Sequence, residues 1–584
     1  MEKKSYSLFI ILPLFLLPFT AFSATFYSRI NGNWNVPSTW STMSCSGVAA
    51  GTTPGVADDV IICAGRTVSI NVASSCNSLT INSSGTAQFT AIVTCAITNT
   101  LSVSGTITGS QTGTFTALNM NIPAGQIATI GRANISISGT LSISGSYLIN
   151  DLTGTKTFAN VALNSGGDWT ANINNPVITI TGNLTMTDGS VIQGSGGNVG
   201  QFTIAGSFIC NAAAGTSDIE KCDLTVQGVT ILNGELRFTA SGAGTKTFNG
   251  GILLNAGSQF DNTVGEDPFI NGNIVNNGTW SDGSGGACTY TFGNAGNYTI
   301  SGNPMIMSGI KILAGTTVTN LGAITVIKNN GLTGAGSFYN GNGTSNAYLA
   351  LRGNTGYNIT FFDASSINNT VEYSSTANQG IGTPNASTYY NLIASGSGVK
   401  SLSNPLIILN NVTISSTLQT SNNNMSVGGN WYENGTFTPG TATVTFNGLI
   451  NQSINSPFNP LGETFYNLTA ANTGMGVSLS SHVTVTNAFA MNGGNIDVQT
   501  NILTLGTSIA SVGTLSRTAG TIIGKFQRWI NATGTSILFP VGTISFYRPA
   551  SLTFTNLTSG SLITEFKPSA PGNSGLPLVD AGIT

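Results

Sequence analysis

The chain has 584 residues, with 18 Lys or Arg and 21 Asp or Glu, so charged residues make up only 7% of it, against about 25% in ordinary soluble domains. Hydrophobic residues make up 40%, which excludes the low hydrophobicity of a disordered chain. One histidine, His482, excludes chemistry that needs paired histidines within this chain, and a net charge of −3 without a basic cluster argues against nucleic acid as a partner.

Residues 1–23 have the pattern of a secretory signal peptide. Lys3 and Lys4 precede the apolar run from Leu8 to Phe19, and Ala21-Phe22-Ser23 fits a small-residue cleavage site. The run is too short to span a membrane, and no later stretch approaches 18 uninterrupted apolar residues. We therefore expect an exported chain, secreted or held at the outer cell surface, without transmembrane insertion once the signal is removed.

Residues 24–85 differ in composition from the long segment after residue 85. They contain Trp34, Trp40 and the Asp58-Asp59 pair. We expect an N-terminal cap module in which the two tryptophans cover the open apolar end of a repeating structure, although flat indole rings are also candidates for stacking on sugars. The aspartates are expected to serve the turn before the Val60–Ile62 strand, because Asp readily accepts bonds from nearby backbone amides.

Seven cysteines in an exported chain favour disulfides. The candidates are Cys45, Cys63, Cys76, Cys95, Cys210 and Cys222. The first four allow three connectivities, of which Cys45–Cys63 with Cys76–Cys95 is the local one, and Cys210–Cys222 would close a third loop and leave Cys288 unpaired. No metal site is expected, because the CxxC spacing and the partner histidines of a zinc site are missing.

Residues 86–515 alternate apolar residues with Ser or Thr and then turn at a glycine. Examples are 101–105, 135–139, 178–182, 202–206, 224–228 and 298–302. Such alternation predicts strands with one buried face. Local signatures also recur at longer range, such as Thr155-Lys156-Thr157-Phe158 again at 245–248. Inexact spacing with recurring signatures predicts stacked turns with loop insertions.

These features predict an all-β fold, a right-handed parallel β-helix over residues 86–515 with one long apolar core. Asparagine suits the corners, since it tolerates left-handed backbone. A series of antiparallel sandwiches is the alternative, because possible hairpin turns such as Asn233-Gly234 and Asp282-Gly283 occur. From residue 516 the glycine corners thin out and charge and proline increase, which predicts a C-terminal β domain over 516–584, truncated if the chain is a piece of a longer protein.

Several patches resemble one family. They are Gly32-Asn33-Trp34 with Trp40, Pro54-Gly55-Val56-Ala57-Asp58-Asp59-Val60, Gly429-Asn430-Trp431 and Phe539-Pro540-Val541-Gly542. They are similar to large surface proteins that Bacteroidota export by type IX secretion, and the first two resemble the G8 module that precedes a β-helix. The resemblance implies a secreted or cell-surface, adhesin-like protein. Members usually end in a sorting domain, which we do not find in this sequence.

Residues for chemistry are sparse. The tight acidic groups are Asp58-Asp59, Asp218 with Glu220, and Glu266-Asp267, and none recurs one turn later so as to stack carboxylates. We therefore expect no catalytic residues, no cofactor and no metal. Trp431 follows a Gly-Asn corner and is expected to pack over it, with sugar stacking as the alternative.

The sequence thus favours a non-enzymatic structural or adhesin-like protein, whose rigid solenoid stalk contacts neutral glycans or other cells. A polysaccharide lyase or glycoside hydrolase of the β-helix type is the alternative, since such enzymes place acids and a Lys or Arg on one sheet face. Ice binding is the third hypothesis, suggested by Thr-x-Thr segments such as 179–181 and 484–486.

Overall fold

The computed structural model describes residues 23–171, 176–194, 200–239, 244–283, 288–557 and 560–568. Within these residues the chain is mostly strand and forms a parallel β-solenoid of about 22 turns. The predicted all-β parallel β-helix is therefore confirmed. The expected signal peptide lies outside the described residues except for Ser23, and so does the end of the expected C-terminal domain after residue 568.

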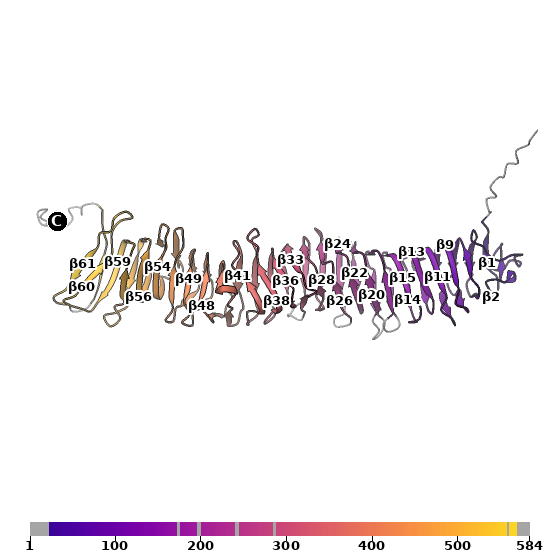
Figure 1. Ribbon diagram of the computed structural model, residues 1–584, viewed down its shortest axis with the longest axis horizontal. Coiled ribbons are helices and arrows are strands. Elements are labelled where there is room, and N and C mark those ends of the chain that lie inside the picture. Colours follow the sequence, from indigo (N-terminus) through magenta and orange to yellow (C-terminus); the bar gives the residue numbers. More distant parts are fainter. Residues whose placement is uncertain are drawn as a thin grey trace, which may run out of the picture. The chain divides into compact units, whose positions relative to one another are not determined.

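The chain divides into two compact units. Unit 1 comprises the described part of residues 1–181 with 194–200, and unit 2 comprises 182–193 and the described residues from 201 onward. In both units the strands of one turn pair in parallel with those of the next, as the successive rungs β9, β11, β13 and β15 of unit 1 illustrate (Figure 1).

Unit 1 has two ladders of strands. The first contains β1 (Thr25–Ser28), β3 (Trp40–Ser41), β4 (Asp59–Ile62), β6 (Ser74–Cys76), β7 (Ser78–Ile81), β9 (Thr94–Val103), β11 (Thr114–Ile122), β13 (Asn134–Ile143), β15 (Lys156–Leu163) and β17 (Val177–Ile180). The second contains β2 (Gly32–Asn33), β5 (Thr67–Ile70), β8 (Thr86–Phe89), β10 (Thr106–Gly109), β12 (Ile127–Ile130), β14 (Ser146–Ile149) and β16 (Asp168–Ala171). A short 3₁₀ helix, Pro37–Thr39, precedes β3.

Unit 2 continues the same design. One ladder holds β18 (Leu184–Met186), β20 (Gly200–Ile204), β21 (Phe208–Cys210), β23 (Cys222–Val226), β24 (Thr230–Leu232), β26 (Lys246–Phe248), β27 (Ile252–Leu254), β29 (Phe269–Ile270), β30 (Ile274–Asn276), β32 (Tyr290–Phe292), β33 (Asn297–Gly302), β35 (Ile310–Ile312), β36 (Thr317–Asn320), β38 (Leu332–Asn340) and β40 (Asn358–Asp363). Another holds β19 (Val191–Gly194), β22 (Thr216–Ile219), β25 (Glu235–Phe238), β28 (Gln259–Asn262) and β31 (Thr279–Asp282).

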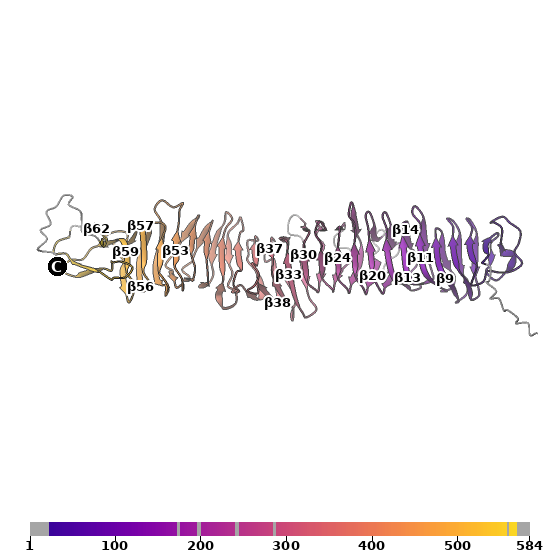
Figure 2. The ribbon, with the colours of Figure 1, turned by 90° about the horizontal axis from the view of Figure 1, so that it is seen from above.

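The later turns of unit 2 form a long ladder and a short one. The long ladder holds β34 (Met305–Met307), β37 (Ala323–Val326), β39 (Tyr348–Leu351), β41 (Thr370–Tyr373), β43 (Thr388–Tyr389), β44 (Asn391–Ala394), β46 (Leu406–Ile408), β47 (Val412–Ile414), β49 (Met425–Val427), β50 (Trp431–Glu433), β52 (Thr443–Phe446), β53 (Gln452–Asn455), β54 (Glu463–Ala471), β55 (Val477–Leu479), β56 (Val483–Gly493), β57 (Ile496–Leu505), β58 (Thr514–Arg517), β59 (Ile522–Ile530) and β62 (Gly560–Thr564). The short ladder holds β42 (Gln379–Ile381), β45 (Val399–Leu402), β48 (Thr417–Gln419) and β51 (Thr436–Thr438), and a 3₁₀ helix covers Asn385–Ser387. Figure 2 shows β53, β56 and β57 as separate rungs of the long ladder.

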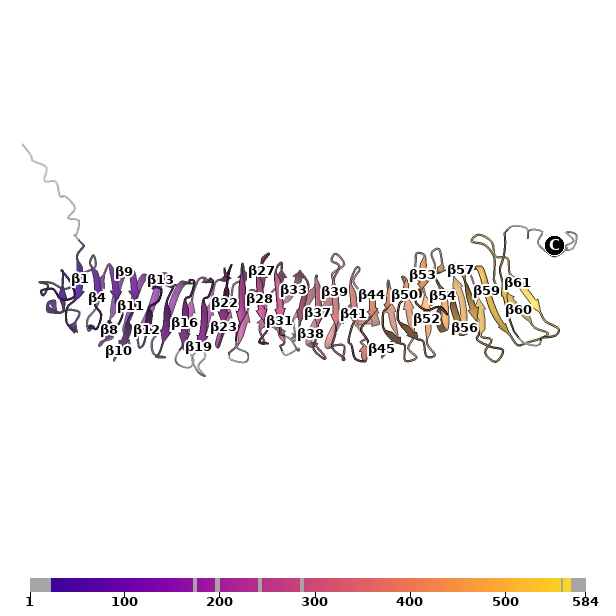
Figure 3. The same ribbon diagram turned by 180° about the vertical axis from the view of Figure 1, so that it is seen from behind.

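The parallel ladder continues past residue 516. β58 and β59 pair in parallel with β56 and β57. Antiparallel pairing then appears in β59–β62. A separate antiparallel pair is formed by β60 (Ser536–Phe539) and β61 (Ala550–Thr553), which Figure 3 shows at the C-terminal end. The predicted limits of the cap module and of the C-terminal domain stay predictions.

The core is a set of inward columns, because alternating residues of in-register strands stack on one another from turn to turn. One buried column of unit 1 contains Val60, Leu79, Leu101, Met120, Leu141 and Val161. Each such side chain contributes about 1.5–3 kcal/mol on burial. The alternation of apolar with Ser or Thr residues in the sequence therefore reflects strands with one buried face, as predicted.

The corners of unit 2 are tied by ladders of side-chain amides. Asn249 donates to Gln227 Oε1 and accepts from Asn271 Nδ2, both at 2.8 Å and both 22 residues away. The glycine of a predicted hairpin turn also serves a corner, since a Cβ on Gly234 would lie 1.8 Å from the carbonyl oxygen of Ala212 in the preceding turn. The Asn-Gly pair at 233–234 therefore marks close stacking of turns rather than a hairpin.

Candidate functional site

A groove of about 730 Å³ on the outer surface of unit 2 gathers charged, hydroxyl and aromatic side chains. Phe269 of β29, Thr291 of β32 and Lys311 of β35 line it as one in-register column, and Thr247 of β26 is the register partner of Phe269 on the preceding turn. Parallel register places these residues about 4.8 Å apart per turn. Phe269 is 37% exposed and Lys311 is exposed, so both are accessible to a ligand.

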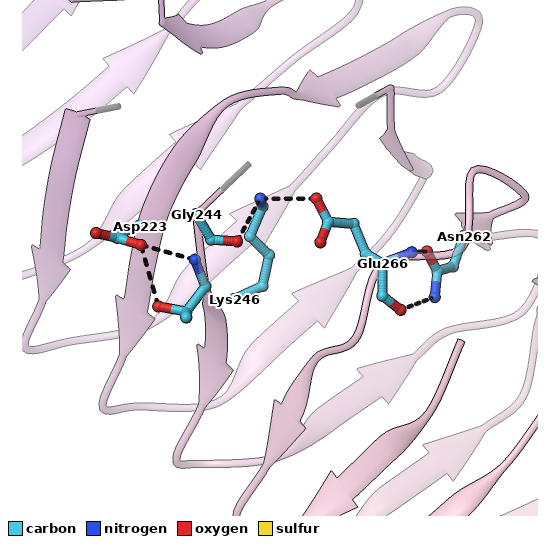
Figure 4. Close-up of polar contacts among 6 residues, drawn as sticks. Asp223, Gly244, Lys246, Asn262 and Glu266 are labelled. Carbon is cyan, nitrogen blue, oxygen red and sulfur yellow. Dashed lines mark hydrogen bonds and ion pairs between the residues drawn. The ribbon is translucent and has the colours of Figure 1, made fainter. Parts of the chain in front are cut away.

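One wall of the groove is built on a buried ion pair. Lys246 Nζ lies 3.0 Å from Glu266 Oε1, and the two side chains are 0% and 5% exposed. Asn262 holds the backbone of Glu266 from both sides, accepting from Glu266 N at 2.8 Å and donating to Glu266 O at 3.0 Å. Figure 4 shows Lys246 and Glu266 pointing toward one another from neighbouring turns.

The local sequence explains why a lysine is buried here. Gly244 has φ +88°, and a Cβ at this position would meet the Cys222 carbonyl oxygen at 2.4 Å, so the corner requires glycine. Asp223 then accepts from both the backbone N–H and the hydroxyl of Thr245, at 2.7 and 3.1 Å (Figure 4). This turn directs the next residue, Lys246, inward, where a charged group needs an opposite charge or several hydrogen-bond partners.

The recurrent Thr-Lys-Thr-Phe segment builds a similar corner in unit 1. Asn134 Oδ1 accepts from the N–H of Thr155 at 2.8 Å and from its hydroxyl at 3.3 Å. Lys156 is again buried and donates to the carbonyls of Ala133, Gly154 and Thr153, at 2.8, 3.1 and 3.3 Å. Burial lowers the pKa of Lys156 to about 8. A cavity of about 420 Å³ lies beside this corner.

The acidic groups of the sequence are occupied by structural contacts. Asp58 accepts from the N–H groups of Ala24 and Gly55, both within 2.9 Å, which confirms its expected turn role. Asp218 forms a bidentate pair with Arg237 at 3.0 and 2.7 Å. In the groove, Glu266 is paired with Lys246, while the exposed Asp267 accepts from Thr289 N at 2.6 Å.

The side chains that line the groove can make several kinds of contact with a ligand. Hydrolysis or elimination on a sugar uses a pair of available carboxyls or a carboxyl with a base; in this groove Glu266 is paired with Lys246, whereas Asp267 and Lys311 are exposed. Hydroxyls, one aromatic ring, a carboxylate and an ammonium group can hydrogen-bond and stack on a polyhydroxylated ligand. Among the residues that the structure describes, no group of three or more His, Cys, Asp or Glu is placed to hold a metal ion.

The three tryptophans singled out in the sequence lie in the interior. Trp34 and Trp40 are 2% and 0% exposed and pack edge to face with ring centroids 5.2 Å apart. Trp40 Nε1 also donates to the Trp34 carbonyl at 2.8 Å. Trp431 is 0% exposed and packs on Phe437 and Phe465. None of the three rings presents a face to a ligand, and the cap role of the first two stays a prediction.

One of the candidate disulfides is formed, between Cys45 and Cys63. Cys76, Cys95, Cys210, Cys222 and Cys288 are buried free thiols. The strand register explains why the predicted Cys76–Cys95 disulfide is absent. Cys76 of β6 lies opposite Ile97 of β9, whereas Cys95 lies opposite Ser74. A hydrogen bond with Cys76, together with burial, raises the pKa of the Cys95 thiol.

The third pair is separated by the strand order. Cys210 lies on β21, whose partner along the ladder is β24, and Cys222 lies on β23, whose partner is β26. The two cysteines therefore occupy rungs that do not pair with each other in these ladders, and burial raises the pKa of both thiols.

Sequence reasoning noticed the Glu266-Asp267 pair and the Thr-Lys-Thr-Phe recurrence but did not connect them, and it missed Phe269 and Lys311. The sequence signal that could have revealed the groove was the spacing of about one turn between Lys246, Phe269 and Thr291.

No family model, no curated protein and no solved structure matches this chain. The fold and the groove define its class as a parallel β-solenoid with a polar surface groove. No helix among the described residues is long and apolar enough to cross a membrane.

Proposed function

We propose that the chain is a non-enzymatic, adhesin-like protein of the secreted or cell-surface type, whose solenoid presents the Phe269 groove to a glycan. The observation that carries this proposal is the in-register column of Phe269, Thr291 and Lys311 along the groove. An exposed aromatic ring between hydroxyls suits the apolar face and hydroxyl rim of a sugar.

Three sequence features support export and a surface location: the signal-peptide pattern, the charge-poor composition, and the resemblance to type IX cargo proteins with a G8-like entry segment. The Cys45–Cys63 disulfide is compatible with an oxidising compartment. Weak contact with neutral sugars fits a surface with few charges, because such a surface does not steer charged ligands.

The experiment is retention of the purified mature chain on a panel of immobilised polysaccharides, with reducing ends assayed in parallel. Phe269→Ala is expected to weaken retention by about three- to tenfold, the equivalent of about 0.5–1.5 kcal/mol of ring contact. Ile407→Ala, at another exposed apolar residue (43% exposed), is the matched control and should leave retention unchanged.

Equal retention by Phe269→Ala and the wild type would contradict the assignment of the groove. Release of new reducing ends would instead favour the lyase or hydrolase alternative.

Ice binding has less support in the geometry. One threonine column among the described residues contains Thr67, Thr86, Thr106 and Thr129 on β5, β8, β10 and β12, and the next position, on β14, is Leu148. A flat hydroxyl array therefore ends after four turns.

A further inference from the structure

Two glutamates of unit 2 lie in the interior of the solenoid. Glu433 ends β50 and Glu463 begins β54, and each residue is 2% exposed. A buried carboxylate is costly unless an opposite charge or several hydrogen-bond donors compensate for it. Elsewhere in the same unit, Glu266 meets this requirement through Lys246.

No basic side chain can serve Glu433 and Glu463 in that way. The sequence contains no Lys or Arg between Lys400 and Arg517. Lys400 Nζ is bonded to the carbonyls of Ser375 and Gly398, at 2.9 Å each, and Arg517 Nε donates to Gly520 O at 2.7 Å. Among the described residues, no ion pair includes either glutamate.

The hydrogen bonds around Glu463 nevertheless suit a charged carboxylate. Trp431 Nε1 donates to Oε2 at 2.7 Å, and the Thr464 N–H donates to Oε1 at 2.8 Å. The Ser456 hydroxyl lies 3.4 Å from Oε2. Donors thus face both oxygens, and hydrogen bonds from N–H groups favour the charged form of the carboxyl.

Glu433 supplies the unsatisfied atom of the pair. Its Oε2 is buried and accepts no hydrogen bond from the described residues. Burial raises the pKa of Glu433, while bonds from Ser456 and from the backbone of Gly435 oppose that shift. β50 and β53 pair with Tyr432 opposite Asn455, so the next residues, Glu433 and Ser456, are neighbours on adjacent turns, and the Ser456 hydroxyl in turn lies 3.4 Å from Glu463 Oε2.

A surface cavity reaches the Glu463 side chain from outside. Glu463 lines a cavity of about 350 Å³ together with Thr436, Phe437, Phe458 and Asn459. A water molecule occupies roughly 30 Å³ of liquid, so a cation with several waters can enter.

We propose that Glu433 and Glu463, with the Ser456 hydroxyl, bind a hard divalent cation, Ca²⁺ or Mg²⁺, that enters through this cavity. Both ions prefer oxygen ligands, and two carboxylates with water completing the shell are sufficient for Mg²⁺ and form a weak site for Ca²⁺. The cation neutralises the pair and satisfies Glu433 Oε2. It thereby fixes the segment between β53 and β54, which carries the exposed Phe458. The inference is independent of the glycan groove.

The test uses the full mature chain, stripped with EDTA and dialysed at pH 8. Addition of CaCl₂ or MgCl₂ is expected to raise the unfolding midpoint of the wild type in a concentration-dependent way. Glu433→Gln, which keeps the shape but removes one ligand, should abolish that rise. Glu372→Gln removes a partly buried acid that accepts from Tyr348 and Ser395 hydroxyls, and as the matched control it should respond as the wild type does.

A second measurement reports cation binding directly on the folded protein, so that the test does not depend on stability alone. Tb³⁺ bound at Glu463 should show emission sensitised by Trp431, because the indole contacts that carboxylate at 2.7 Å. Glu433→Gln should weaken Tb³⁺ binding by about tenfold or more, since affinity follows the charge of the ligand set. The proposal is overturned if neither chloride shifts the wild-type midpoint, or if Glu433→Gln binds Tb³⁺ as tightly as the wild type.

Discussion

Breaking the buried Lys246–Glu266 pair should be one of the most damaging single changes in unit 2. The atoms are 3.0 Å apart and the side chains 0% and 5% exposed, which at an effective dielectric of 20 corresponds to about 5 kcal/mol of attraction. Asn262 fixes the backbone of Glu266 beside Lys246. Glu266→Gln or Lys246→Met should therefore each cost about 3–5 kcal/mol, mostly from the charge left unpaired.

The double variant Lys246→Met/Glu266→Met should behave differently, because it leaves no buried charge. We expect its stability within about 1 kcal/mol of the wild type, or higher. Native-state hydrogen exchange over β26 and β29 is the appropriate assay, since it reports local opening in a solenoid that need not unfold as one unit. Arg237→Met, which breaks the Arg237–Asp218 pair with side chains 40% and 16% exposed, is the control and should cost about 1 kcal/mol or less.

A loss below about 1 kcal/mol in both single variants would refute this reasoning. The reasoning would also be refuted if the double variant lost as much stability as the two single variants together, because the coupling expected for a buried pair would then be absent.

The remaining predictions concern acidity, the corner ladders and the disulfide. Burial raises the pKa of Glu463 from 4.5 to about 7. In EDTA, the stability contributed by its protonated carboxyl is therefore fully present below about pH 4.5, and the free energy of unfolding falls by about 3 kcal/mol as the pH rises to about 7. Unfolding midpoints should show this pH dependence in the wild type, and an equal pH dependence in Glu463→Gln would contradict it. Asn249→Ala breaks two side-chain bonds between turns and should cost about 1 kcal/mol in denaturant unfolding; no measurable change would show that water replaces the ladder. Cys45→Ser/Cys63→Ser opens a link of sequence separation 18 and should cost about 3 kcal/mol, seen as faster proteolysis of residues 24–85; equal cleavage rates with and without the disulfide would contradict this.

The strand pattern could be predicted because it is local. Segments such as 101–105 and 135–139 alternate apolar residues with Ser or Thr, and burial of one face follows directly from that period. The parallel solenoid could be predicted too, since glycine corners, asparagines and sparse charge agree with stacked turns.

The groove could not be predicted in the same way, because its parts come from different turns. Lys246, Glu266, Phe269 and Lys311 are spread over some 65 positions, and their proximity depends on a register of about one turn per 22 residues in this region. Changes in corner length alter that register, and local alternation carries no information about it.

The sequence by itself determined the class of fold, the inward columns and the corner chemistry, because each depends on residues close together in the chain. The tertiary structure decided which side chains meet between turns. It buried Trp34, Trp40 and Trp431, placed Cys76 opposite Ile97, and brought Trp431 against Glu463. Such contacts depend on the length of every intervening corner, and so they become fixed only when the turns stack.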